Sequence, residues 1–205
     1  MSDATATPND ATATRPRIAP LEEPYSDQTA AMLAKWMPPG SGVEPLRLFR
    51  TLAVHEQLAS RMRPLGAGIL GSSARVDPRL REVMIARTCA LTGAQYEWGV
   101  HAVAFARPFG ISDEQLFASV HGHAGEDCWD AEQACVVALA DELHHTSAVS
   151  DALWERLRAS FDEQQILELI VTAGYYHAIS YVCNALRVAD EEWAEPFPTA
   201  APQQP

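Results

Sequence analysis

Residues 93–101 read GAQYEWGVH, and this stretch is the most informative part of the chain. It places Glu97 and His101 four residues apart in a segment whose pattern predicts a helix. Side chains at this spacing lie on one helical face, one turn apart, so the carboxylate and the imidazole can hydrogen-bond. A carboxylate fixes the tautomer of an imidazole and raises its basicity, which suits acid–base chemistry near neutral pH. An ordinary structural Glu–His pair has the same spacing and stays open as an alternative.

The segments around this stretch also read as helices, and none reads as a convincing strand. Asp77 and Pro78 predict a helix start and Gly93 its end, because proline favours the first helical position and glycine the residue after the last. The next helix covers residues 95–107. Further helices are predicted over residues 28–36, 45–62, 112–120, 130–145, 150–157 and 161–186. The sequence therefore predicts an all-α protein.

The predicted domain is single and flanked by two tails. Residues 1–25 are rich in Ala, Thr, Asp and Pro and predict a disordered N-terminal tail. Residues 26–190 hold the predicted helices, and residues 191–205 form a Pro-rich C-terminal tail. A chain of 205 residues fits one domain plus tails.

Charge and hydropathy exclude several classes of partner. The formal net charge is -12, from 27 acidic and 15 basic residues, whereas nucleic acids and anionic membranes need a basic face. We find no apolar run of roughly 18–20 residues and no apolar signal-peptide core. These observations predict a cytoplasmic protein that binds neither nucleic acid nor membrane.

The four cysteines are scattered and form no C-x-x-C pair. Cys89, Cys128, Cys135 and Cys183 are expected to be reduced, small apolar residues. No two of them have the spacing of zinc ligands. We therefore expect no structural zinc.

Other side chains of these helices are candidates for a pocket beside the imidazole. Phe105 shares the helical face of the Glu–His pair and offers an apolar wall. Tyr96 and Trp98 flank the carboxylate, with core or interface packing as their alternative role. Tyr176 and His177 on the last helix could approach the same site, although a hydrogen-bonded core histidine is equally compatible with the pattern.

Arg87 falls inside an apolar stripe of the helix that starts at Asp77. A buried arginine needs an anionic partner, which is either a nearby carboxylate or the carboxylate of a substrate. The same helix is apolar around most of its girth, which indicates an oligomer contact as well as a core position. Glu97, His101 and His177 could in principle hold a metal, but no metal-binding signature is present, and we expect neither a metal nor another cofactor.

The runs REVMIAR at 81–87, LTGAQYEWGVH at 91–101 and GIS at 110–112 resemble the carboxymuconolactone decarboxylase and AhpD-like alkylhydroperoxidase superfamily. The resemblance covers roughly residues 45–188. It implies an AhpD-like helical bundle that assembles as a homo-oligomer, commonly a trimer or a hexamer.

The peroxidase branch of that superfamily carries C-x-x-C, then three residues and a histidine, with a proton-relay glutamate upstream. Counted back from the histidine, the two cysteine positions hold Ala94 and Glu97 here, and Glu82 stands at the relay position. Peroxide reduction by this route needs an attacking and a resolving sulfur. The disulfide mechanism is therefore excluded, and peroxidase activity through Cys89 alone is the remaining thiol alternative.

The resemblance thus implies the decarboxylase side: a cofactor-free lyase acting on a small carboxylated or lactone-like metabolite. In this hypothesis His101 is the acid–base residue, Glu97 orients it, Glu82 is a relay, and Arg87 holds a second carboxylate of the substrate. The substrate-binding set adds Tyr96, Trp98, Phe105, Tyr176 and His177. The alternative function is a non-catalytic member that binds a small ligand or serves as an assembly subunit.

Overall fold

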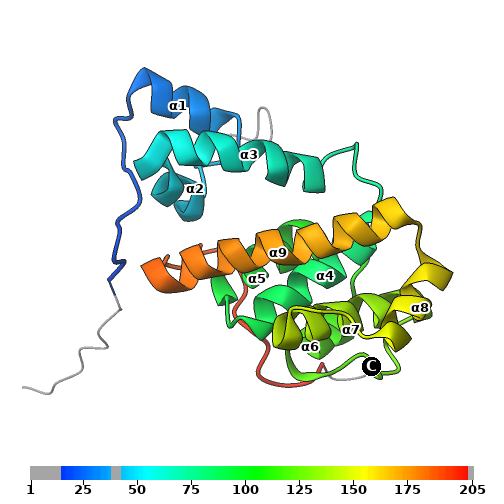
Figure 1. The fold of residues 1–205 in the computed structure, drawn as a ribbon. Coiled ribbons are helices and arrows are strands. Elements are labelled where there is room, and N and C mark those ends of the chain that lie inside the picture. The colour runs from blue at the N-terminus through cyan, green and yellow to red at the C-terminus, as the bar shows by residue number, and fades with distance from the viewer. Residues whose placement is uncertain (1–14, 38–42, 203–205) are drawn as a thin grey trace, which may run out of the picture.

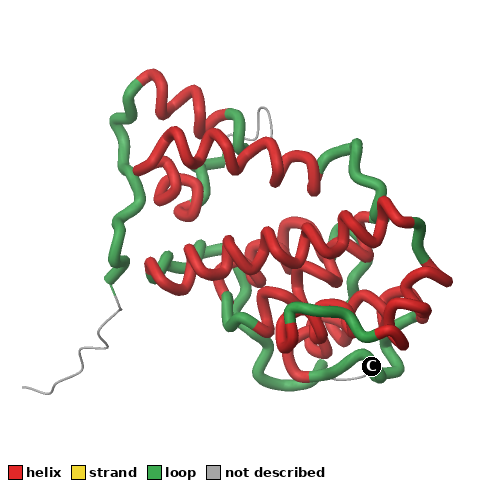
Figure 2. Tube along the Cα trace, in the orientation of Figure 1, coloured by secondary structure: helices red, strands yellow, loops and turns green. Residues whose placement is uncertain are grey.

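The structure is a computed structural model, and it describes residues 15–37 and 43–202. Every regular element in this part is helical, and Figure 2 shows no strand there. The elements are α1 (Asp27–Ala34), α2 (Arg47–Leu52), η1 (Ala53–His55), α3 (Glu56–Leu70), α4 (Pro78–Leu91), α5 (Gln95–His101), η2 (Ala102–Ala106), α6 (Asp113–His121), α7 (Ala131–Thr146), α8 (Asp151–Ser160) and α9 (Glu163–Leu186). The prediction of an all-α fold is confirmed for this part of the chain.

Helix α4 lies at the centre of the core. It packs against α5, α6, α7 and α9, and its Met84, Ile85 and Cys89 are fully buried. In Figure 1, α1, α2 and α3 lie on one side of α9, whereas α4 to α8 lie on the other. The apolar girth of α4 therefore serves the interior of one chain, because neighbouring helices cover it on several sides.

The helix ends follow from local side-chain chemistry. Asp77 caps α4 by accepting from the backbone N–H of Arg79, and Pro78 takes the first helical position. Gly93 ends α4 with φ +66, a conformation that side-chain-bearing residues rarely adopt. Ser112 opens α6 with a capping box, as the sequence predicts. These contacts span two or three residues, so the sequence alone specifies them.

The prediction of one helix over residues 45–62 is wrong. The chain forms α2, the 3₁₀ turn η1 and then α3, which continues to Leu70. His55 interrupts the helix with φ -121 and ψ 74, and its Nδ1 accepts from the N–H of Leu58 at 3.4 Å. Pro64 lies inside α3, on an exposed face where the carbonyl it leaves unbonded is accessible to solvent.

Segments at both ends of the chain pack on the helical core. Residues 1–14 lie outside the described part, but Arg17 donates its N–H to the carbonyl of Leu186 at 2.8 Å. After α9 the chain folds back along α5, where a Cβ on Gly99 would lie 2.1 Å from the carbonyl oxygen of Glu195. Only glycine permits this close approach, which explains why Gly99, the second glycine of the GAQYEWGVH stretch, carries no side chain.

Helix α9 is long and apolar enough to cross a membrane by length and composition, which the sequence analysis missed. The core helix of a soluble protein has the same pattern. Of its most apolar window, 44% is buried inside the protein, where α9 packs against α4, α5 and α7. Its apolar character therefore has a structural explanation within the fold.

Candidate active site

His101 ends α5 and is buried, with 3% of its surface exposed. Directly after it the helix widens into the π-helical turn η2, in which the N–H of Arg107 donates to the carbonyl of Ala102 at 3.3 Å. The sequence predicted an unbroken α-helix to residue 107, so this turn is a departure. Its Phe105 stacks on the imidazole with ring centroids 4.8 Å apart. Single π-turns inside helices occur frequently at functional sites.

The carboxylate that fixes the imidazole comes from α4. Glu82 Oε2 lies 2.7 Å from His101 Nδ1, while Glu82 Oε1 accepts from Arg81 Nε at 3.2 Å. Arg81 and Glu82 are both buried. The sequence pattern assigned the orienting role to Glu97, whereas the packing of α4 against α5 brings Glu82 closer to the ring than the helical i,i+4 spacing brings Glu97.

The other ring nitrogen faces two further polar groups. The hydroxyl of Tyr176 on α9 lies 3.1 Å from His101 Nε2, and Glu97 Oε1 lies 3.5 Å from the same atom. The second carboxylate oxygen of Glu97 is buried and has no hydrogen-bond partner among the described residues. Helices α4, α5 and α9 thus bring two carboxylates and a phenol around one imidazole.

The two carboxylates decide the protonation state of His101. Burial lowers its pKa, but the attraction and hydrogen bond of Glu82, followed by those of Glu97, outweigh burial and raise the pKa from 6.5 to about 9. The ring is therefore an imidazolium at neutral pH. Its Nδ1–H donates to Glu82, and its Nε2–H is placed to donate to the oxygen of Tyr176.

Tyr176 keeps its own proton under the same conditions. Burial, with Glu97 and Glu82 nearby, raises the pKa of this phenol well above its ordinary value of 10. Since its oxygen accepts from His101, its hydroxyl hydrogen is free to point elsewhere. The site therefore holds two coupled proton donors.

These groups line a cavity of about 800 Å³ between the α1–α3 layer and the α5–α9 side of the core. Glu97, His101, Phe105 and Tyr176 contribute to its wall. The remaining lining is mostly apolar and aromatic and includes Trp36, Leu48, Phe49, Leu70, Val100, Tyr175, Ile179 and Trp193. A largely apolar cavity of this size with a few convergent polar groups is typical of a small-molecule site.

Arg87 is not among the described residues that line this cavity. Its Nε donates to Asp141 Oδ1 at 2.6 Å, and its Nη1 donates to the carbonyl of Ser119 at 3.1 Å. The sequence left two partners open for Arg87, a nearby carboxylate of the protein or a carboxylate of the substrate. In the structure the partner is the protein carboxylate Asp141. The role of Arg87 as a substrate-carboxylate ligand therefore has no support in this geometry.

Tyr96 and Trp98 are likewise not among the described residues that line the cavity. Tyr96 donates its hydroxyl to Glu191 Oε1 at 2.6 Å and accepts from the N–H of Leu48. Trp98 donates its indole N–H to the hydroxyl of Ser119 at 3.0 Å. Both side chains are buried, in agreement with the packing role that the sequence offered as their alternative.

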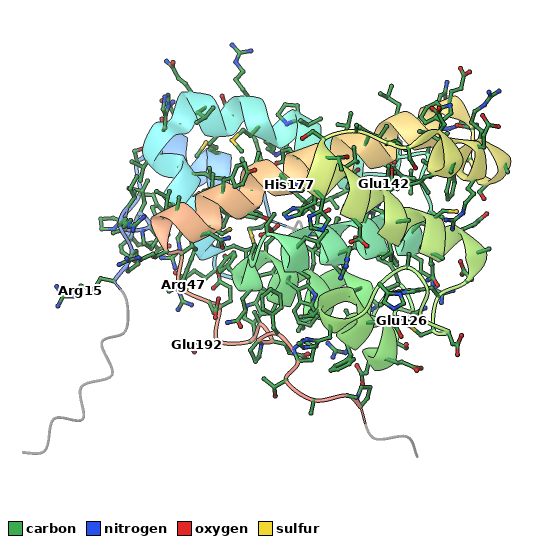
Figure 3. The ribbon with its side chains drawn as sticks, turned by 60° about the horizontal axis from the view of Figure 1, so that its bottom comes forward. Arg15, Arg47, Glu126, Glu142, His177 and Glu192 are labelled. Atoms are coloured by element: carbon green, nitrogen blue, oxygen red, sulfur yellow. The ribbon has the colours of Figure 1, made fainter. Side chains whose placement is uncertain are left out.

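His177 faces α7 and does not join the His101 site. Its Nε2 lies 3.0 Å from Nδ1 of His144, and its Nδ1 bonds the carbonyl of Ala173. Figure 3 labels His177, which belongs to α9, and Glu142, which belongs to α7. Glu97, His101 and His177 are thus not brought together, and the described part contains no group of three or more His, Cys, Asp or Glu side chains arranged for a metal ion.

All four cysteines are free, as the sequence predicts. Cys89 is fully buried behind the site, and burial together with Glu97 raises the pKa of its thiol well above 9. A buried thiol that stays protonated is a poor nucleophile. This geometry weighs against peroxidase activity through Cys89 alone.

Several cavity residues had no signal in the sequence. Lys35 and Trp36 follow α1, Arg63 lies on α3, and Trp193 lies in the segment after α9. Their contribution depends on how the outer segments fold over the core. Only the aromatic character of the two tryptophans hinted at a packing role.

Comparison with known proteins gives a family match over part of the chain and a shared fold. Residues 56–142 match the sequence model of the carboxymuconolactone decarboxylase family. An uncharacterized peroxidase-related protein from Silicibacter sp. TM1040 has a similar structure, with a TM-score of 0.75, 14% identity and coverage of 88% of this chain and 96% of that chain. A second similar structure is an uncharacterized peroxidase-related protein from Ralstonia eutropha JMP134, described as an alkylhydroperoxidase AhpD core. Its TM-score is 0.72 at 14% identity, and the match covers 85% of this chain and 93% of that chain.

A third similar structure is a variant of the debrominase Bmp8 in complex with 2,3,4-tribromopyrrole. Its TM-score is 0.70 at 14% identity, and the match covers 88% of this chain and 94% of that one. No curated protein matches the sequence significantly. The matched segment contains the motif at residues 81–101, and the similar structures show that the chain shares an AhpD-like helical fold.

Proposed function

We propose that this protein is an acid–base lyase of the carboxymuconolactone decarboxylase type that acts on a small carboxylated or lactone-like metabolite. One observation carries the proposal: His101, kept protonated by Glu82, contacts the Tyr176 hydroxyl at the wall of a mostly apolar cavity. A buried acid of this kind can put a proton on carbon. The apolar wall favours loss of a poorly solvated carboxylate.

In the proposed reaction the bond between the carboxylate carbon and its neighbour breaks, and CO2 leaves. The electron pair moves into a conjugated carbonyl and gives a dienolate. The Tyr176 hydroxyl, with its oxygen bonded to His101, is a donor for the negative charge that develops. A proton then passes from His101, directly or through Tyr176, to the substrate carbon. The neutral imidazole takes its next proton from solvent.

The two carboxylates have different roles in this scheme. Glu82 orients His101 and stabilises the imidazolium through the 2.7 Å contact. Glu97, at 3.5 Å from Nε2, adds a second negative charge beside the imidazolium and so helps to keep the ring protonated before the proton is transferred to the substrate. Neither carboxylate replaces the missing sulfurs of a peroxidase.

The test is CO2 release from carboxymuconolactone by wild type, His101→Ala and Tyr176→Phe. General acid catalysis contributes about 10²- to 10⁴-fold to a rate, so we expect losses of that order in both variants. The acid form must be present, so the rate should fall as the pH rises above the His101 pKa of about 9. Full activity in His101→Ala would refute the assigned role.

A second candidate function is binding of a small ligand without turnover. It is favoured by the near-complete burial of His101, whose two ring nitrogens already have partners inside the protein. A similar fold occurs in a debrominase in complex with 2,3,4-tribromopyrrole, which is a small ring. Thermal stabilisation by lactones or small rings without any product would favour this candidate over the lyase.

We also propose that the protein assembles with itself, as a trimer or hexamer, through α9, and that it works in the cytoplasm. The outer face of α9 carries an apolar stripe in which Leu167, Val171 and Tyr181 are exposed. Exposed apolar stripes of this kind mark interaction surfaces. Light scattering should give an oligomer for wild type and a smaller species for Leu167→Glu with Tyr181→Glu, and a monomeric wild type would refute self-assembly.

A further inference from the structure

Two cations lie together at the edge of the cavity. Lys35 is exposed and Arg63 is half-buried, and both contribute to the cavity wall. Arg63 Nε donates to the carbonyl oxygen of Lys35 at 2.9 Å, which leaves the terminal guanidinium nitrogens available. Neither residue forms an ion pair with a carboxylate of the described part of the chain. This differs from the buried arginines, since Arg81 and Arg87 are both paired with carboxylates.

The inner end of the cavity has no charge left for an anion. The imidazolium of His101 lies between Glu82 and Glu97, and Arg81 is bound to Glu82. The lining between this site and the edge is mostly apolar. Among the described residues that line the cavity, Lys35 and Arg63 are the only lysine and arginine, so they are the cations that can bind a carboxylate. A carboxylate placed elsewhere in the cavity would be buried without a cationic partner, which is costly.

The charge of the whole protein makes this pair more informative. A net charge of -12 repels small anions from most of the surface. A local pair of unneutralised cations at a cavity edge reverses that field where a ligand would enter. Lys35 also lies outside residues 56–142, so this part of the wall is an addition to the segment that matches the family.

We infer that Lys35 and Arg63 form an anion site that holds a retained carboxylate of the ligand at the cavity edge. The ligand class is an elongated acid with one such carboxylate, an aromatic or extended apolar body along the cavity, and its reacting carbonyl system at His101 and Tyr176. The reacting end rests on the proposed function, whereas the binding of the carboxylate does not require turnover.

The experiment compares binding of 6-phenylhexanoate with binding of the neutral 6-phenylhexanamide by calorimetry. The two probes share the apolar body and differ in charge. Because hydrogen bonds to charged groups are stronger than those between neutral groups, wild type should bind the acid at least about tenfold more tightly than the amide, which corresponds to about 1.4 kcal/mol. This preference should shrink as salt is added, because the edge of the cavity is open to solvent.

Variants locate the site. Arg63→Ala and Lys35→Ala should each reduce the preference for the acid, and the double variant should bind acid and amide alike. Arg61→Ala is the matched control, since Arg61 is exposed on the same helix and does not line the cavity. The inference is overturned if wild type does not prefer the acid, if neither probe binds, or if Arg61→Ala has the same effect as Arg63→Ala.

The same titration in His101→Ala separates this inference from the proposed function. A preserved preference for the acid, together with no CO2 release by wild type, would refute only the lyase. Loss of CO2 release in His101→Ala, without any preference of wild type for the acid, would refute only the anion site.

Discussion

The stability of the fold should depend on pH through one buried histidine. The pKa of His101 is about 9 in the folded protein, compared with 6.5 for a histidine without these partners. Glu82 and Glu97 raise it by more than burial lowers it. The folded state therefore binds this proton more tightly than the unfolded chain. The stabilisation is complete below the unfolded pKa and is lost as the pH rises through the folded pKa.

The magnitude follows from the two pKa values. A difference of one pKa unit corresponds to about 1.4 kcal/mol, so the interval from 6.5 to about 9 corresponds to about 3 kcal/mol of unfolding free energy. Domains are stable by only about 5–15 kcal/mol in total. The loss between these pH values is therefore large enough to measure.

Urea denaturation of wild type and His101→Gln at about pH 6 and about pH 9.5 measures this effect. Glutamine cannot titrate in this range, so the difference between the two proteins isolates His101. Wild type should lose about 3 kcal/mol more than the variant as the pH rises. Parallel losses in both proteins would refute the assigned protonation state, and an NMR titration of the His101 ring would show where its proton is lost.

Two further substitutions test the packing around the site. Gly99→Ala places a Cβ 2.1 Å from the carbonyl oxygen of Glu195 and should lower the unfolding free energy by about 1–3 kcal/mol in thermal denaturation. Gly68→Ala on α3 is its control, since its Cβ would meet nothing within 4 Å and should leave stability equal or higher. Arg87→Ala leaves Asp141 without its partner and should cost about 1–3 kcal/mol in urea denaturation, while kcat/KM for the proposed CO2 release stays unchanged in the folded protein. A large fall in kcat/KM would instead return Arg87 to the substrate site.

The parts of the fold that depend on near neighbours in the chain could be predicted. The start at Asp77, the end at Gly93 and the capping box at Ser112 rest on contacts that span a few residues. The break at His55 could not, because the apolar pattern continues through it and histidine is an uncommon cap. The π-turn after His101 could not be predicted either, because its residues AVAFA carry no proline or glycine to mark a break.

The members of the site were easier to predict than their roles. Motif and helical spacing identified Glu82, Glu97, His101 and Tyr176, which the structure brings together. Which carboxylate lies nearer the ring depends on how α4 packs against α5; the sequence pattern favoured Glu97, whereas Glu82 makes the shorter contact. The partner of Arg87 is 54 residues away, a separation at which sequence spacing carries no geometric information.

The outer wall of the cavity was the least predictable part. Several of its residues, such as Lys35, Trp36 and Trp193, come from segments before and after the family-matched region, including a C-terminal stretch whose prolines indicated only a tail. These segments gain their positions from tertiary contacts, such as the packing of Phe197 against Trp98 with ring centroids 5.5 Å apart. Ligand specificity, which depends on this wall, is therefore harder to predict from the sequence than the helices or the members of the site.

The most direct test of the central claim is CO2 release from carboxymuconolactone by metal-stripped protein, measured for wild type beside His101→Ala. The account predicts release by wild type and a loss of about 10²-fold or more in the variant, while circular dichroism shows both proteins folded. Equal release by the two proteins would contradict the role of His101. No release by wild type would contradict the decarboxylase itself and favour the ligand-binding alternative.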